Sequence, residues 1–339
     1  MAAEPSAKAR AWVLFDRIVA CAAPDGVHSN PWFKSPDGQL RFEPDFDTLA
    51  RLLGVPLHLK AGTQSGVPAL ALDVWLSYEL RRAGFNADQA WPRPVHPRIL
   101  PAPIANLLKA LPASLRKAVA DRIEKDGAIT GATSSSGIIL GKNYLKQVDV
   151  VISDWVTGPE LLISTKRMDS SYGKNAPNRI EESYGDAKNL RLRHPLAALG
   201  FVFGLRSDIL QKEPATAEWL FDLLAKLGRE DDAYHATCLV LMDYANDGAI
   251  PETGEDPPVT ALPEPGRELE DDDAPAPTPA DVVDRDIAQL PKVTILKEAI
   301  PEELAPGRFL AAMVTRVLGA TPVNMHKEAR RRRASPQQR

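Results

Sequence analysis

The chain has 339 residues, of which 44% are hydrophobic and 25% are charged, and its formal net charge is -4. This length can hold one large domain or two ordinary ones, and the composition is typical of a globular protein. The small net charge excludes a global attraction to nucleic acid, but 248–281 is acidic whereas 166–193 and 327–333 are rich in Lys and Arg. Two cysteines are too few for a disulfide framework and favour a cytoplasmic protein. No uncharged run reaches about 18 residues, so we expect no membrane span.

Apolar residues in the N-terminal half recur at helical spacing, which predicts several helices there. The expected helices cover residues 7–23, 46–53, 68–82 and 102–126. We therefore divide this half into a helical N-terminal region, 1–60, and the start of a core that spans 61–247. The helices at about 100–127 are an insertion into that core.

The C-terminal part changes in composition at residue 248. Residues 248–281 are dense in Pro, Asp and Glu and cannot bury enough apolar surface to fold, so we expect a disordered acidic linker. A helical segment over 282–325 follows, with its main helix at about 301–319. Residues 326–339 are a basic tail, which either adds nonspecific phosphate affinity or is disordered.

Two apolar runs, 147–152 and 160–166, are separated by a short turn and predict an antiparallel hairpin. Asp149 lies near the start of the first strand and Lys166 ends the second, so antiparallel pairing brings them together. After the hairpin, the pattern alternates between helix and strand.

These later elements are a helix over 178–192, a strand over 199–205, a helix over 215–228 and a strand over 236–243. With a further strand expected at 137–141, the alternation predicts an α/β fold, a mixed central sheet flanked by helices.

An acid and a lysine at one edge of a hairpin suit the hydrolysis of a phosphodiester. Mg²⁺ prefers oxygen ligands, which Asp149 and a backbone carbonyl at Thr165 would supply. Lys166 would orient or deprotonate the attacking water and stabilise the developing charge. Strand alternation places Ser164 on the same face as Lys166, at the position where a second carboxylate is expected.

These residues resemble the PD-(D/E)xK nuclease superfamily over about 137–205, with a looser extension back to the helix at 68–83. Asp149 takes the first acidic position, without a preceding proline, and Ser164-Thr165-Lys166 takes the (Asp/Glu)-x-Lys position. The resemblance implies a restriction-endonuclease-like core.

One subgroup of restriction enzymes is similar in having Ser-x-Lys, with its second acid moved into the following helix. Glu181 and Glu182 lie 15 and 16 residues after Lys166 on the helix predicted there. The resemblance implies that one of them is a catalytic metal ligand, and that Glu79, on the first core helix, is an additional acid.

Basic residues near these acids suit a polyanionic substrate. Contacts with DNA phosphates are predicted for Lys146, Arg167, Lys174 and Arg179. The alternative is a solvated helix face on which charges of both signs are mixed.

The resemblance implies a metal-dependent endonuclease that cleaves double-stranded DNA with Mg²⁺, for which Mn²⁺ substitutes. It would be a type II restriction enzyme or a related phage-defence enzyme, acting as a homodimer, with a cognate methyltransferase as partner at the same DNA site. A second hypothesis, prompted by Ser164, is a catalytically inactive nuclease fold that binds DNA or acts in assembly. A serine hydrolase built on 134–136 or Ser164 is the third hypothesis, although no Gly-x-Ser-x-Gly motif supports it.

Overall fold

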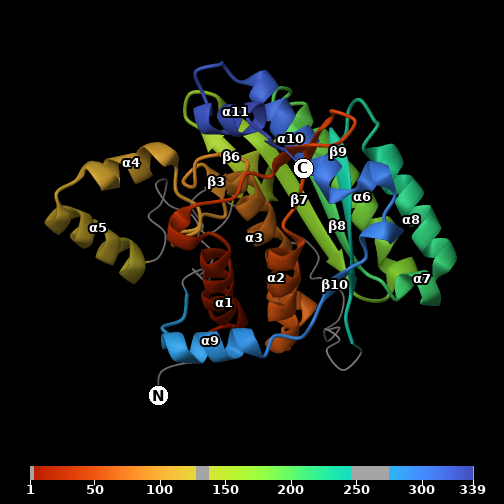
Figure 1. The fold of residues 1–339 in the computed structure, drawn as a ribbon, viewed down its shortest axis with the longest axis horizontal. Coiled ribbons are helices and arrows are strands. Elements are labelled where there is room, and N and C mark those ends of the chain that lie inside the picture. Colours follow the sequence, from red (N-terminus) through yellow and green to blue (C-terminus); the bar gives the residue numbers. More distant parts are fainter. Residues whose placement is uncertain (1–3, 127–136, 246–274, 339) are drawn as a thin grey trace.

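Within residues 4–126, 137–245 and 275–338, which the computed structural model describes, six strands form a mixed sheet with helices on both faces (Figure 1). The strand order is β10-β9-β8-β7-β6-β3. The strands are β3 Ala90–Trp91, β6 Val150–Asp154, β7 Gly158–Met168, β8 Ala198–Arg206, β9 Ala236–Asp243 and β10 Thr294–Ile295. This architecture confirms the predicted α/β class.

The predicted hairpin is present as the antiparallel pair of β6 and β7, in which Val150 lies opposite Ile163. β7, β8 and β9 are parallel, and they are connected by helices α6 Tyr172–Arg191 and α8 Pro214–Leu227. The first predicted strand is, however, divided at Asp149. Residues before it form β5 Leu145–Val148, which pairs with β4 Gly137–Leu140 in a separate two-stranded sheet.

The N-terminal helices pack on one face of the large sheet. They are α1 Ala7–Ala22, α2 Phe46–His58 and α3 Val67–Arg82, and α10 Pro306–Ala320 lies on the same face. Leu161 and Ile163 of β7 are buried against this layer, whereas Leu162 is buried against the layer that contains α6 and α8. The alternation of side chains along a strand explains why β7 is apolar throughout its central part.

The single helix predicted over 102–126 is wrong, because the structure contains two helices, α4 Ala102–Ala110 and α5 Ala113–Asp126. Leu111 between them is extended, with φ −68° and ψ 147°. Pro112 disfavours helical backbone at the residue before it, which ends α4. The two helices project away from the sheet at the left of Figure 1.

Helix α6 begins at Tyr172, six residues before the predicted start, and contains Pro177. Proline in this position removes one backbone hydrogen bond, the one that its own N–H would donate to Gly173, and the helix continues through it.

The basic tail is part of the folded protein. It forms α11 Lys327–Ala334 and β11 Gln337–Gln338, and β11 pairs with β1 Trp32–Lys34. The Arg332 Nη1 donates to the carbonyl of Arg82 at 2.7 Å. Since its backbone and this arginine are engaged within the fold, the tail is not the disordered arm that was one of the two expectations.

The acidic linker predicted over 248–281 lies mostly outside the described residues, and its last residues, 280–281, begin α9 Ala280–Ala288. The remaining short elements are β2 Leu40–Phe42, α7 Ile209–Lys212 and 3₁₀ turns at Pro24–Gly26, Thr63–Ser65, Lys297–Ala299 and Glu302–Leu304. Among the helices of the described residues, none combines the length and the apolar character needed to cross a membrane.

Candidate functional site

The candidate site lies where β5, β6, β7 and α6 meet. Asp149 occupies the bend between β5 and β6, and its Oδ2 accepts a hydrogen bond from the backbone N–H of Thr165 at 2.8 Å. The register of β6 and β7 produces this contact, because Val150 pairs with Ile163 and the chain before Val150 therefore runs beside Ser164 and Thr165. The backbone of β7 fixes the Asp149 carboxylate.

Lys166, near the end of β7, reaches across to α6. Its Nζ lies 3.2 Å from Oε2 and 3.3 Å from Oε1 of Glu182. The side chains are 24% and 33% exposed, respectively, so the pair is accessible from solvent. Glu181, one position earlier on α6, is exposed, and the structure therefore brings only Glu182 to Lys166.

Two further charged residues complete the cluster. Lys146 on β5 lies 2.5 Å from Oδ2 of Asp186 and 3.4 Å from Oε1 of Glu182. The Tyr144 hydroxyl donates to Oδ1 of Asp186 at 3.0 Å. Asp186 was not predicted from the sequence, although its position four residues after Glu182 puts both acids on the same helical face.

The turn between β4 and β5 is attached to α6 by Asn189. Its side-chain Oδ1 accepts from the N–H of Asn143 at 2.9 Å, and its backbone carbonyl accepts from the N–H of Lys142 at 2.8 Å. A Cβ at Gly141 would lie 2.0 Å from the Asn189 amide nitrogen, so this approach requires glycine. The attachment holds β5, and thereby Lys146, against the acidic face of α6.

The electrostatic environment separates the two candidate metal ligands. Burial raises the pKa of Asp149 above its ordinary value, and the Thr165 N–H together with Lys166 and Lys146 offsets only part of that effect. Burial would also raise the pKa of Glu182, but Lys166 and Lys146 outweigh it and leave that pKa lowered. Asp149 is thus the acid whose charged form is costly in this site, and Glu182 is the acid whose charge is well compensated.

Ser164 and Thr165 face opposite sides of the sheet, as strand alternation predicted. Ser164 is buried and hydrogen-bonds to the phenol of Tyr234. The Thr165 hydroxyl donates to Oδ1 of Asp73 on α3 at 2.6 Å. Asp73 is therefore an acid of the first core helix that contacts the β7 strand at the site.

Glu79, predicted as that acid, lies elsewhere on the same helix. It is fully buried, accepts from the backbone N–H of Asp45 at 2.7 Å, and pairs with Arg82 at 2.7 Å. It is six residues beyond Asp73, which is about 9 Å along a helix. Burial raises its pKa to about 7, although Arg82 opposes the shift. Its contacts join α3 to the start of α2 and do not include Asp149 or Lys166.

The predicted phosphate-binding residues fall into different environments. Arg167 is buried, with only 2% of its side chain exposed, and its guanidinium pairs with Asp169 at 2.9 Å. This buried ion pair corrects the expectation that Arg167 is a surface cation. Lys174 is exposed and Arg179 is half-buried on α6, whereas Lys146 is held by the two acids of that helix.

The donor chemistry of the cluster fits a hard divalent cation, since Asp149 and Glu182 offer carboxylate oxygens and already lie in the field of positive charges, Lys166 and Lys146. Within the described ranges, no group of three or more His, Cys, Asp or Glu side chains is placed to hold one ion together. Two protein carboxylates completed by water and substrate oxygens are a usual arrangement for Mg²⁺.

Comparisons with family models, with curated proteins and with solved structures found no match for this chain.

Proposed function

We propose that this protein is a metal-dependent endonuclease that hydrolyses phosphodiester bonds of double-stranded DNA, of the PD-(D/E)xK type. The observation that carries the proposal is the contact of Lys166 with Glu182, next to an Asp149 carboxylate anchored on Thr165. Three chain segments supply these residues, in the order that the resemblance implies. The succession of α3, the antiparallel strands β6 and β7, helix α6 and the parallel strand β8 gives further support.

Asp149 and Glu182 would hold Mg²⁺, with Mn²⁺ as a substitute. The bound cation supplies polarisation of the scissile phosphate and a water of lowered pKa. Lys166 positions the attacking water and stabilises charge that develops on the phosphate oxygens. Asp186 acts through Lys146, which it holds beside Glu182. Thr165, held between Asp149 and Asp73, keeps β7 in register with the acid.

Lys174 is exposed on α6, the helix that carries Glu182, and supports a polyanionic substrate, because a cation there could contact the DNA backbone. We further propose a role in restriction or related phage defence, in which the protein acts as a homodimer on symmetric sites. A methyltransferase that modifies the same sites would protect the host DNA.

The direct test is incubation of the purified full chain with unmethylated and methylated duplex DNA of high sequence complexity, with Mg²⁺, Mn²⁺ or EDTA. We expect cleavage that requires the cation. Asp149→Ala and Lys166→Ala should each abolish cleavage while DNA binding persists. Glu181→Gln is the matched control and should cut normally. Intact DNA under every cation condition, with the protein shown to be folded, would overturn the proposal.

The second candidate is an inactive nuclease fold that binds DNA or serves in assembly. It is favoured by the ion pairs within the site, since Lys146 and Lys166 already neutralise Glu182, and by Ser164 in the position of an acid. Calorimetric titration with Mg²⁺ and Mn²⁺ separates the two candidates. No metal binding, combined with DNA binding that Asp149→Ala leaves unchanged, would favour the second.

A further inference from the structure

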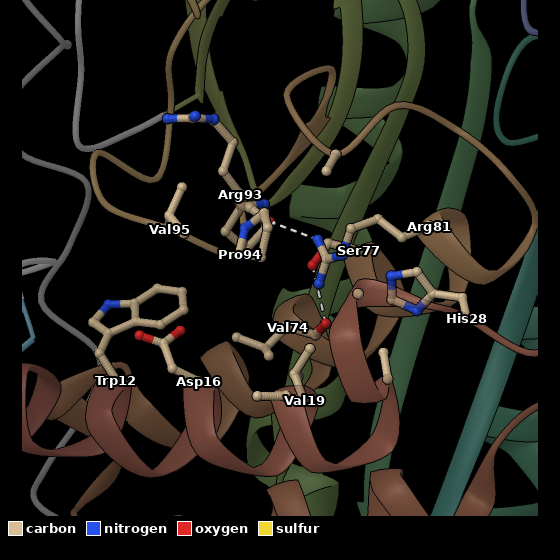
Figure 2. A pocket seen from close by; sticks show the side chains of 15 residues that line it. Trp12, Asp16, Val19, His28, Val74, Ser77, Arg81, Arg93, Pro94 and Val95 are labelled. Carbon is tan, nitrogen blue, oxygen red and sulfur yellow. Dashed lines mark hydrogen bonds between the residues drawn. The ribbon is translucent and has the colours of Figure 1, made fainter. Parts of the chain in front are cut away.

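A separate cavity of about 340 Å³ lies between α1, α3 and the segment that follows β3 (Figure 2). This volume is within the range of small-molecule sites. None of Asp149, Lys166 and Glu182 lines it. Its apolar wall includes the side chains of Trp12, Val19, Val74, Pro94 and Val95.

Arg81, on α3, is a cationic residue that lines this mainly apolar cavity. The residue is only 4% exposed. Its Nη1 donates to the carbonyl of Pro92 at 3.2 Å, one of the hydrogen bonds drawn as dashed lines in Figure 2, and its buried Nε has no acceptor. Within the described part of the chain no carboxylate hydrogen-bonds to this guanidinium, and its Nη2 donates no hydrogen bond there. Nε is enclosed by protein atoms, so Nη2 is the donor that an anion in the cavity can reach.

The other charged residues of the cavity wall have partners of opposite charge. Asp16 accepts from Nη1 and Nη2 of Arg98 at 2.9 and 2.8 Å. Arg93 donates to Oδ1 of Asp88 from Nε at 3.0 Å and from Nη2 at 2.6 Å.

The remaining titratable group, His28, adds no charge at neutral pH. Burial and the nearby Arg81 lower its pKa to about 4, and its Nδ1 is buried without a hydrogen-bond partner. Burial also lowers the pKa of Arg81, but only to about 10, so its guanidinium stays positive. The cavity thus contains one cation without a hydrogen-bonded anion, inside a mainly apolar wall.

We propose that this cavity binds a small organic carboxylate with an apolar body, whose carboxylate pairs with the Arg81 guanidinium and whose body packs between α1 and the Pro92–Val95 segment. Such a ligand matches both properties of the site, since it supplies a charged acceptor oxygen for Nη2 and apolar surface for the wall. Its charge complements Arg81, which has the charge of Asp16 nearby but no carboxylate hydrogen-bonded to it.

The test uses benzoate and indole-3-acetate as probes, with benzamide and indole-3-acetamide as uncharged counterparts of the same shape. Binding to the full chain is measured by isothermal titration calorimetry and by the shift of the unfolding midpoint. Two variants alter the site: Arg81→Met removes the cation, and Ala20→Phe narrows the cavity while Arg81 is kept. Arg17→Met is the matched control, because it removes a charge from the outer side of α1, where Arg17 pairs with Asp284.

We expect the acids to bind and raise the unfolding midpoint, and the amides to bind about tenfold or more weakly, because a charge-assisted pair is lost. Arg81→Met should weaken binding of the acids about tenfold or more, Ala20→Phe should reduce it, and Arg17→Met should leave it unchanged. If Arg81→Met does not fold, Ala20→Phe and the acid-to-amide ratio decide. Absence of binding by both acids at millimolar concentrations, or equal binding of acid and amide, would overturn the proposal.

Discussion

The Lys166 ammonium lies 3.2 Å from the nearer carboxylate oxygen of Glu182, which joins the end of β7 to the second half of α6. Glu181 is adjacent in sequence but exposed. Neighbouring residues of a helix point about 100° apart, so only one of two consecutive acids can face the strand. The helix selects Glu182 as the partner of the lysine.

If Glu182 is the displaced acid of the proposed nuclease, Glu182→Gln should lower the rate of Mg²⁺-dependent cleavage about 10- to 100-fold, because it removes a charged ligand and the partner of Lys166. Glu181→Gln changes the same charge one residue away and should leave the rate unchanged. Single-turnover cleavage of duplex DNA measures both. Equal rates for the two variants would show that the charge of α6, and not this contact, matters.

The two acids of the site should have opposite effects on stability. The pKa of Asp149 is raised in the folded protein, so its ionised form is disfavoured there, and Asp149→Asn should stabilise the protein at neutral pH. This gain should shrink as the pH falls toward 3.8, the ordinary value of the carboxyl group, where both folded and unfolded chains become protonated.

The pKa of Glu182 is lowered, so its contribution is present above the ordinary value of 4.5 and is lost as the pH falls through the folded pKa. Glu182→Gln should therefore destabilise the protein at neutral pH. Urea unfolding of the wild type and both variants measures these effects. The pH series runs from about 3.5, where carboxyl groups become protonated, to about 8, where they are ionised. A destabilised Asp149→Asn at neutral pH would contradict the pKa direction on which the prediction rests.

Arg167 should contribute to stability and not to DNA affinity. Its guanidinium pairs with the buried Asp169, whose Oδ1 also accepts from the Tyr244 hydroxyl. Arg167→Met would leave a buried carboxylate without its cation, and we expect a loss of about 3–5 kcal/mol in the free energy of unfolding. Chemical denaturation measures this loss.

Lys174→Ala is the comparison for Arg167, because Lys174 is an exposed cation on α6. We expect little change in stability. The slope of the logarithm of duplex affinity against the logarithm of salt concentration should become shallower by about one released counterion. Fluorescence anisotropy with labelled DNA at several salt concentrations measures the slope. A normal stability of Arg167→Met would show that Asp169 finds another partner.

The hairpin and the helix that follows it could be predicted because their signals are local. Alternation and apolar runs predicted β6 and β7, and the spacing after Lys166 placed Glu182 on the next helix. The contacts of Lys146 could not be predicted, since they depend on the break at Asp149 that directs β5 out of the large sheet. Arg167 was mistaken for a surface residue because its partners include Tyr244, which is distant in sequence.

The orientation of helix α3 could not be predicted from the sequence. Nearly all of its residues are buried, so it has no polar face from which its orientation can be inferred. Asp73, Glu79 and Arg81 all lie on it, and only tertiary packing decides that Asp73 contacts Thr165, that Glu79 contacts Arg82, and that Arg81 enters the cavity. The sequence shows that this helix carries both Asp73 and Glu79 but does not say which of them contacts β7.

Arg81 also allows a stability prediction without any ligand. Burial lowers its pKa from 12.5 to about 10, which corresponds to a cost of roughly 3 kcal/mol for the charged form. Arg81→Met keeps most of the side-chain volume and loses one hydrogen bond, to Pro92, whose carbonyl lies at the cavity. We therefore expect the variant to gain about 1–2 kcal/mol in the free energy of unfolding.

The stability gain expected for Arg81→Met should depend on pH in a way that follows from the lowered pKa of Arg81. A cation with a lowered folded pKa destabilises the protein at every pH well below that pKa, and the cost disappears only as the pH rises above the unfolded value. The gain of Arg81→Met should therefore be the same at pH 6 and pH 8, both of which lie on the order of two or more pH units below the folded pKa. Urea unfolding at both pH values measures it.

Arg98→Met is the control for Arg81→Met, because Arg98 is equally buried but holds Asp16 with two hydrogen bonds. Its loss takes both hydrogen bonds away from Asp16 and should destabilise the protein by about 1.5–3 kcal/mol. If Arg81→Met were destabilised to the same extent, the Arg81 cation would be balanced within the protein, through Asp16, and the cavity would have no unmatched charge to offer a carboxylate. If Arg81→Met is more stable than the wild type and no longer binds benzoate, Arg81 serves ligand binding and lowers the stability of the protein.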